Sequence, residues 1–216
     1  MLRRLAVLML ALAGASGVVL ATVSGSAAPG SIAGTRVVVP AIARSLQPTP
    51  VPRPYAGPVA SLTLESAALT SASGVEVRDT EFVGGEETFQ LPTHPSLIAW
   101  YEAFGRPGFG GANSIFAAHI DYVNYGLGPF AYLTSADIGD TLYVRMDNGI
   151  EYAYTVLSVE TIRLEDINMH SVVFPGLPSD RERVTLVSCG GTFVPYPGGG
   201  GQYNSRVILV AERSIP

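Results

Sequence analysis

The only cysteine of the chain, Cys189, ends an apolar stretch, residues 184–188, and is followed by Gly190 and Gly191. A nucleophilic thiol must be presented to a substrate while its backbone stays fixed, and the end of a strand before a glycine turn meets both needs. The alternative is a small buried core residue, which is how most free cysteines behave. Cys189 is therefore a candidate nucleophile whose own position leaves both interpretations open.

A histidine and an arginine occupy comparable places on two other apolar stretches. His119 ends one stretch and Arg206 opens another. An imidazole exchanges protons as a general acid or base, and a guanidinium at the mouth of a strand can donate hydrogen bonds to developing negative charge. The alternatives are a structural histidine and a solvated arginine on an edge strand. Two more histidines, His94 and His170, are present, and spacing alone does not choose among the three.

The elements that must position these residues are short strands. The 24 glycines and 16 prolines make up 40 of 216 residues, which argues against a helical bundle and favours strands joined by turns. The clearest element is a hairpin with strands 141–147 and 150–160 around an Asn-Gly pair at 148–149, which is typical of a type I′ turn. Short helices are expected at 95–104 and 164–170. Further strands are expected at 59–64, 75–77, 113–119, 184–188 and 207–211. The pattern predicts an all-β fold, mainly strands with one or two short helices, closed or nearly closed into a barrel.

The first 28 residues are predicted to be a membrane segment. Arg3 and Arg4 precede an uncharged apolar run of 19 residues, 5–23. As a helix this run is roughly 28 Å long, about the hydrocarbon thickness of a bilayer. A signal peptide cleaved near the small residues at 25–27 also fits, but the length of the run favours an uncleaved signal-anchor. In both cases the paired arginines predict that the rest of the chain is extracytoplasmic.

A tether and one folded domain are expected after the membrane segment. Six prolines between residues 40 and 58 predict that residues 29–57 form an extended, semi-rigid spacer. Residues 58–216 then remain as the folded domain, which carries the three candidate residues.

Charge and cysteine content exclude two classes of protein. All 13 basic residues are arginine, and from residue 65 onward eight of them face 18 acidic residues, a net charge of −10. Nucleic acid is excluded as a partner, because neutralising phosphates requires a basic face. A single cysteine also excludes a disulfide framework.

Several stretches together resemble the sortases, the cysteine transpeptidases of Gram-positive-type cell surfaces. Residues 185–189 read TLVSC and resemble the family's TLxTC signature, with Ser188 where the family commonly has threonine. Residues 116–121 read FAAHID, similar to the family's strand-end histidine motif, and residues 205–210 read SRVILV, similar to its arginine-led final strand. The segment 91–101, LPTHPSLIAWY, is similar to one that precedes the histidine strand in class F and some class E sortases.

The resemblance covers residues 58–216 and implies a closed β-barrel of about eight strands with a thiol mechanism. Cys189 would attack the carbonyl of a Thr-Gly-like bond in the C-terminal LPXTG-like sorting motif of another surface protein. His119 would protonate the leaving amine and then act as base for the incoming amine. Arg206 would stabilise the oxyanion or position the substrate, and the Ser188 hydroxyl would assist.

The resemblance also implies the partners. These are surface proteins with a sorting motif, an amine acceptor from a peptidoglycan precursor or a protein, and the membrane through the N-terminal segment, with water as a slow acceptor. No cofactor is expected. Some sortase classes bind calcium, but the sequence has no dense carboxylate cluster, so no metal site is predicted. His94 and His170 are assigned to structure.

Two alternatives from other classes remain. L,D-transpeptidases are also exported, β-rich and cysteine-dependent, but they place a histidine shortly before the cysteine in a Ser-His-Gly-Cys setting. Here Ser188 precedes Cys189, and the nearest histidine before it is His170. The other alternative is a non-enzymatic, membrane-tethered β module that binds surface proteins. Nothing is missing from the three key positions, which argues against that module.

Overall fold

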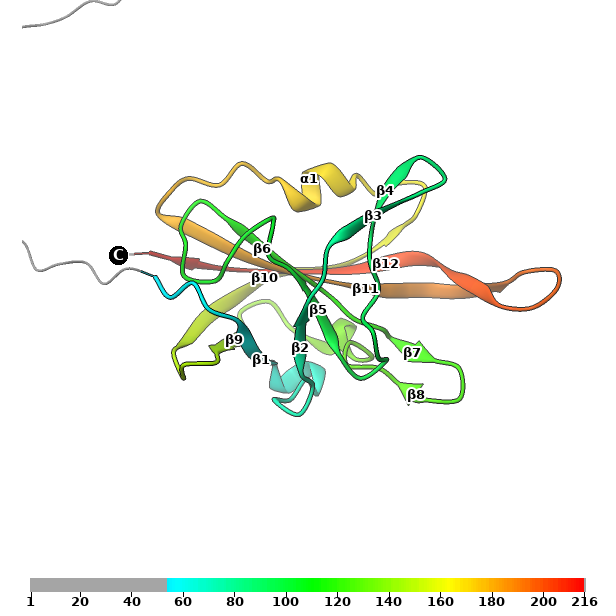
Figure 1. Cartoon of the computed structure of the whole chain (residues 1–216), viewed down its shortest axis with the longest axis horizontal. Coiled ribbons are helices and arrows are strands. Elements are labelled where there is room, and N and C mark those ends of the chain that lie inside the picture. Colours follow the sequence, from blue (N-terminus) through cyan, green and yellow to red (C-terminus); the bar gives the residue numbers. More distant parts are fainter. Residues whose placement is uncertain (1–53, 216) are drawn as a thin grey trace, which may run out of the picture. The chain divides into compact units, whose positions relative to one another are not determined.

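Eight strands form one sheet in the computed structural model, which describes residues 54–215 (Figure 1). The strand order is β1-β9-β10-β12-β11-β6-β5-β2. The pairs β6–β11 and β2–β5 are parallel, and the other neighbours are antiparallel. The strands are Val59–Thr63 (β1), Val75–Val77 (β2), Ile98–Tyr101 (β5), Asn113–Ala117 (β6), Thr141–Met146 (β9), Glu151–Arg163 (β10), Arg181–Pro195 (β11) and Gly201–Ser214 (β12).

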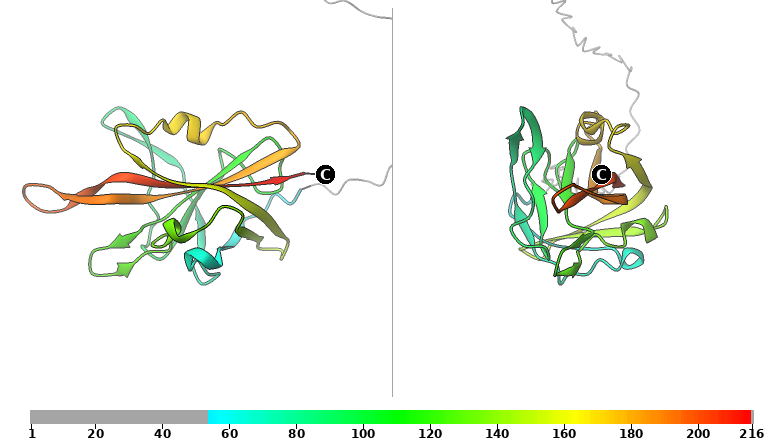
Figure 2. Two further views of the ribbon diagram at one scale, coloured as in Figure 1. Left: turned by 180° about the vertical axis from the view of Figure 1, so that it is seen from behind. Right: turned by 90° about the vertical axis from the view of Figure 1, so that its right-hand side faces the viewer.

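The sheet curls until its two edges meet. The edge strands β1 and β2 contact each other, and the end-on view in Figure 2 shows the strands wrapped around a shared interior. Buried hydrophobic side chains fill this interior, among them Trp100 and Phe116, whose rings stack with centroids 6.2 Å apart. The predicted all-β, nearly closed barrel is confirmed.

The β9–β10 hairpin confirms the clearest prediction but corrects its turn. Leu142, Val144 and Met146 of β9 are buried while the residues between them are exposed, because successive side chains of a strand point to opposite faces. Residues 147–149 form a three-residue loop, in which the Gly149 N–H donates to the Met146 carbonyl at 3.0 Å and Gly149 has φ +88°. A type I′ turn requires positive φ at both central residues, here Asn148 and Gly149. Among the described residues only Ala68 and Asn124 are non-glycines with positive φ, so Asn148 does not meet this requirement and the predicted turn type is wrong. A loop one residue longer requires a left-handed conformation only at its glycine.

The two predicted helices are corrected as well. Within the segment 95–104, residues 98–101 form β5 between β6 and β2, with all four residues buried. Pairing on both edges and burial of both faces override the local preference of this segment. The helix expected at 164–170 begins later, as α1 (Met169–Val173). Asn168 caps it by accepting the Ser171 N–H at 3.1 Å.

Helix α1 packs on the outer face of the barrel wall. Its Val173 belongs to a second hydrophobic cluster with Tyr101, Ile115, Val187 and Ile208. The wall formed by β5, β6, β11 and β12 is therefore covered on both sides, by the interior core and by α1. The smaller elements are two hairpins, β3 (Thr80–Val83) with β4 (Glu86–Phe89) and β7 (Asp121–Tyr122) with β8 (Gly126–Leu127), and two 3-10 turns, Glu65–Ala67 and Leu133–Ser135.

The membrane segment predicted for residues 1–28, and all but the last four residues of the tether at 29–57, lie outside the described residues. Within residues 54–215, no helix has both the length and the apolar character needed to span a bilayer. The domain boundary at residue 58 stays a prediction.

A buried carboxylate joins three strands to a loop. Glu182 of β11 is 1% exposed and accepts hydrogen bonds from Tyr154 of β10, from Arg213 Nε of β12 at 2.7 Å and from the Gly108 N–H at 3.0 Å. The Arg213 guanidinium also lies over the Tyr152 ring, 4.6 Å from its centroid. All three donors reach Oε1, while Oε2 is buried with no hydrogen-bond partner among the described residues. Losing Arg213 would therefore leave a buried negative charge without its counterion.

We expect Arg213→Met to lower the free energy of unfolding by about 3–5 kcal/mol, since Glu182 would then be a buried carboxylate without a counterion. Arg163→Met is the matched control, because Arg163 pairs with Glu165 and Asp166 at the surface. Such an exposed ion pair contributes no more than about 1 kcal/mol. Urea unfolding followed by circular dichroism measures both, and equal losses would contradict the assignment.

Candidate active site

Cys189 and Arg206 face each other across two neighbouring strands. The antiparallel register of β11 and β12 pairs Cys189 directly with Arg206. Residues directly opposite in an antiparallel ladder project to the same face, with close Cβ atoms. Both side chains are half-buried. The thiol and the guanidinium, 17 positions apart in sequence, are thus neighbours on one side of the barrel wall.

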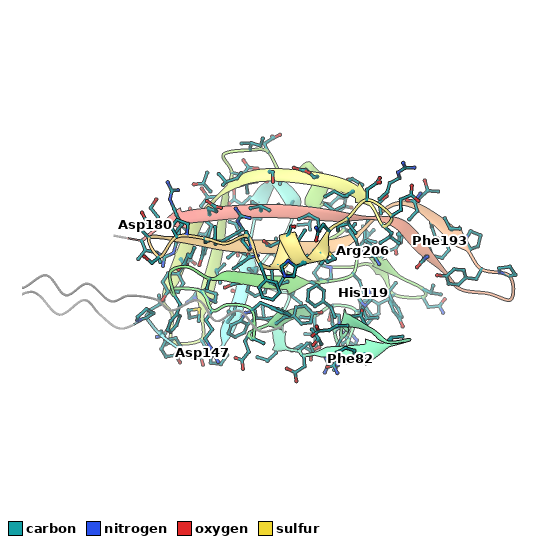
Figure 3. All side chains as sticks on the ribbon, turned by 90° about the horizontal axis from the view of Figure 1, so that it is seen from above. Phe82, His119, Asp147, Asp180, Phe193 and Arg206 are labelled. Atoms are coloured by element: carbon teal, nitrogen blue, oxygen red, sulfur yellow. The ribbon has the colours of Figure 1, made fainter. Side chains whose placement is uncertain are left out.

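His119 joins the same face from the other side of β11. Strands β6 and β11 run parallel, with Val187 opposite Ala117, and the Ala118 N–H continues the ladder to the Val187 carbonyl at 3.3 Å. Strand β6 ends at Ala117, whereas β11 continues through Cys189. Extending the register by two residues beyond the end of β6 brings His119 beside Cys189. Figure 3 shows His119 and Arg206 at neighbouring places along the barrel. The order across the wall is therefore His119, just past the end of β6, then Cys189 on β11 and Arg206 on β12.

Side-chain alternation places this row on the outer face of the wall. Ile115 and Ala117 of β6, and Val187 and Ile208 of the next two strands, pack in the cluster beneath α1. His119 follows Ala117 by two positions, Cys189 follows Val187 by two, and Arg206 precedes Ile208 by two. The same alternation that buries apolar side chains under α1 delivers the polar row just beyond the helix.

Ser188 belongs to the opposite face. Its side chain is 3% exposed, and its hydroxyl donates to the carbonyl of Ala118 at 3.1 Å. The hydroxyl thus ties β11 to the residue before His119 from inside the barrel. The sequence-based role of Ser188, assisting at the substrate, would require it on the other face of the strand.

The segment carrying His119 is held by its backbone. The carbonyl of His119 accepts the Phe130 N–H at 3.1 Å, and the carbonyl of Ile120 accepts the Gly128 N–H at 2.9 Å. Gly128 approaches so closely that a Cβ at this position would lie 2.7 Å from the carbonyl carbon of His119. Residue 128 must therefore be glycine for the histidine backbone to keep its place.

Burial favours the neutral forms of both ring and thiol. Desolvation lowers the pKa of His119, and the nearby Asp121 carboxylate opposes this by raising it. Desolvation raises the pKa of Cys189, the Arg206 charge opposes this by lowering it, and Asp121 raises it further. At neutral pH the resting site is therefore mostly thiol and imidazole, with thiolate and imidazolium as a minor form.

Two residues that the sequence reasoning did not select also lie at the site. The Tyr203 hydroxyl donates to Asp121 Oδ2 at 2.6 Å, which raises the pKa of Tyr203 to about 12. Arg206 Nη1 donates to the carbonyls of Ser205 at 3.0 Å and Tyr203 at 3.4 Å. The available signal was proximity in sequence, because Asp121 follows His119 by two positions and Tyr203 precedes Arg206 by three.

The other two histidines lie in different surroundings. The His94 ring contacts Ser96 Oγ at 2.8 Å and packs edge-on against Tyr125. The His170 ring packs against Phe174 at the end of α1. Residues 54–215 contain no group of three or more histidine, cysteine or carboxylate side chains arranged to hold a metal ion.

Comparison with known proteins gives one family. A family model described as Sortase domain matches residues 75–214. No curated protein matches the sequence. Similar solved structures include sortase A from Corynebacterium diphtheriae, with 19% identity over 55% of this chain and 48% of that one and a TM-score of 0.39. Sortase C-1 from Actinomyces oris has 20% identity over 55% and 58% and a TM-score of 0.39. The SrtA sortase from the same organism has 16% identity over 73% and 80% and a TM-score of 0.49. The chain thus spans about half the length of the first two structures.

We expect alkylation of Cys189 by iodoacetamide to show a midpoint above pH 8.5, the ordinary value of about 8.5 being raised by burial. Arg206→Gln should move the midpoint to still higher pH, because the guanidinium lowers the thiol pKa and only the thiolate reacts. Arg145→Gln is the control, because it removes the same charge from an exposed residue of β9. It should leave the alkylation midpoint unchanged. A midpoint that falls in Arg206→Gln would contradict the electrostatics described for the row.

Proposed function

Because this chain belongs to the sortase family, whose domain model matches residues 75–214, we propose that it cleaves the C-terminal, LPXTG-like sorting motif of surface proteins. The acyl part would pass through a thioester on Cys189 to an amine acceptor, or slowly to water. The observation that carries the proposal is the row formed by Cys189 and Arg206, paired on β11 and β12, and His119, two residues past the end of the neighbouring β6. It provides a base, a nucleophile and an oxyanion donor on one face.

In the first half-reaction the Cys189 thiolate attacks the carbonyl carbon of the scissile peptide bond. Negative charge moves onto the carbonyl oxygen, where the Arg206 guanidinium donates hydrogen bonds. Arg206 Nη1 already bonds two backbone carbonyls, and the guanidinium has further N–H donors for the substrate. Collapse of the tetrahedral intermediate breaks the C–N bond, and His119 gives its proton to the leaving amine.

In the second half-reaction His119 is neutral and accepts a proton from the incoming amine. The amine attacks the thioester carbonyl, a new amide bond forms, and the thiolate of Cys189 leaves. His119 gives up one proton in the first half-reaction and regains one in the second, so the enzyme returns to its starting state. Ser188 contributes from the interior, where its bond to the Ala118 carbonyl holds the His119 segment against β11.

The membrane part of the proposal rests on the N-terminal sequence. The paired Arg3 and Arg4 and the apolar run 5–23 support a single-pass signal-anchor with the catalytic domain outside the cytoplasm. The proline-rich residues 29–57 would then act as the spacer between bilayer and barrel. A surface protein held at the same membrane and an amine from a peptidoglycan precursor or a protein would be the two substrates.

We expect Cys189→Ala and His119→Ala to fold and to lose cleavage of LPXTG-type peptides altogether. Arg206→Lys should keep only a small part of the activity, because one ammonium cannot replace a planar set of donors. The assay is a peptide library varied around the motif, read by mass spectrometry with and without added amines. Cleavage by Cys189→Ala at the parent rate would disprove a thiol mechanism.

The pH profile of kcat/KM should be a broad bell. Activity should fall on the acid side below about pH 6.5, because burial lowers the pKa at which His119 gains a second proton. It should fall on the alkaline side above about pH 8.5, because burial raises the pKa at which Cys189 loses its proton. Between the limbs the active thiolate–imidazolium fraction is constant, because it carries the same number of protons as the neutral pair. A narrow optimum between two limbs at pH 6.5 and 8.5 would contradict these shifts.

A further inference from the structure

The outer ends of β11 and β12 form an arm, residues 193–203, that projects beyond the barrel in Figures 1 and 2. The ladder that pairs Cys189 with Arg206 is interrupted before the arm begins. Gly190 pairs with Ser205, but the next pair is Phe193 with Tyr203, so Gly191 and Thr192 face the single residue Asn204. This is a β-bulge, and bulges bend the strand that contains them.

Because the bulge interrupts the ladder, the ladder alone does not set the direction of the arm, and contacts outside it also matter. Gly191 has φ +76°, and the Thr192 N–H donates to Asn204 Oδ1 at 2.9 Å, so the bulge is closed by side-chain and glycine geometry. Further out, Phe193, Val194 and Tyr196 are each between 44% and 48% exposed, so none of them is part of the buried core. A hydrogen bond between the base of the arm and another segment therefore has a large influence on where the arm lies.

Tyr203 makes such a bond and contacts both sides of the site. Its hydroxyl donates to Asp121 Oδ2 at 2.6 Å, on the short strand β7 that follows His119. Its carbonyl accepts from Arg206 Nη1 at 3.4 Å. One residue of the arm thus connects the segment of the candidate acid–base residue to the guanidinium of the candidate oxyanion donor.

We propose that Asp121 and Tyr203 form a latch that fixes the arm to β7 and so positions Arg206 relative to Cys189 and His119. Both are positioning residues, since they act through Arg206 and the arm. The proposal rests on the proposed function, because it assigns these residues to the cleavage carried out by the row. The chemistry is that of a charge-assisted hydrogen bond, which is shorter and stronger than a neutral one.

The Asp121 carboxylate has a second, separable effect. The titratable and charged groups around it are His119 and Tyr122 on its own segment, Cys189 on β11, and Tyr203 and Arg206 on β12. Its negative charge raises the pKa of His119 and the pKa of Cys189. Removing the charge should therefore move both limbs of the pH profile to lower pH, whereas breaking the latch alone should leave them in place.

The test compares four single variants and the double variant Tyr203→Phe/Asp121→Ala, all in the full chain in detergent micelles, with an LPXTG-type peptide as probe. Tyr203→Phe removes the hydroxyl donor and keeps the Asp121 charge. Asp121→Ala removes both the acceptor and the charge, and Asp121→Asn keeps an acceptor oxygen while removing the charge. Tyr55→Phe is the matched control, because Tyr55 is a second tyrosine beside a carboxylate, Asp147, which raises its pKa. Asp147 lies at the other end of the barrel in Figure 3.

We expect Tyr203→Phe to lower kcat by roughly three- to tenfold, the effect of one net hydrogen bond, with unchanged pH limbs. Asp121→Ala should lose as much kcat, and the double variant no more than either single, because both break the same contact. Asp121→Asn should recover turnover relative to Asp121→Ala and shift both limbs to lower pH. Tyr55→Phe should match the parent. Additive losses, or no recovery in Asp121→Asn, would overturn the latch.

Two measurements need no substrate and so separate the latch from the proposed function. Amide hydrogen exchange across residues 193–203 should be faster in Tyr203→Phe than in the parent, because the arm is released. The alkylation midpoint of Cys189 should fall in Asp121→Asn and stay in place in Tyr203→Phe. If the parent cleaves no peptide but these shifts occur, the proposed function fails and the contact stands. If the parent cleaves peptide and arm exchange is unchanged, the latch is wrong.

Discussion

The parallel register between β6 and β11 is the constraint on which the site depends. A shift of one residue would turn Cys189 toward the interior and Ser188 outward, because side chains alternate along a strand. Buried polar groups hold this register. Thr185 Oγ1 donates to Asn113 Oδ1 at 2.9 Å, and Asn113 Nδ2 donates to the carbonyls of Val172 at 2.8 Å and Val173 at 3.2 Å. The same contacts therefore fix both β-strand pairing and the end of α1, since an unpaired amide at this depth would be costly.

The half-buried position of the row balances two demands. Burial keeps the thiol of Cys189 protonated in the resting protein, which protects a single cysteine from oxidation. The cost is that only a small fraction of the thiol is in the reactive thiolate form. Arg206 increases this fraction, because its charge lowers the pKa of Cys189. The proposed mechanism would therefore use a minor protonation state that stays available over a wide pH range. It would depend on oriented neighbours more than on a strongly acidic thiol.

The sequence predicted those features that are encoded locally. Cys189, His119 and Arg206 were selected as candidates because each stands at one end of an apolar stretch. The β9–β10 hairpin was predicted correctly because its alternation is regular. Residues 98–101 were misassigned because their strand character comes from the partners β6 and β2 and not from a pattern of their own. Glu182 could not be placed in the core, because its partners Tyr154 and Arg213 lie 28 and 31 residues away. The Asp121–Tyr203 contact spans 82 residues, and only the folded barrel brings the two together.

Strand β12 follows β10 and β11 along the chain yet lies between them in the sheet. The wall between β10 and β11 therefore cannot form until β12 has been synthesised. Pairing between segments that are distant in sequence is also slow. Arg206 is part of that late strand, so the candidate nucleophile Cys189 is synthesised before the residue that completes its surroundings. The order of the strands thus delays assembly of the candidate thiol site until nearly the whole barrel has been synthesised.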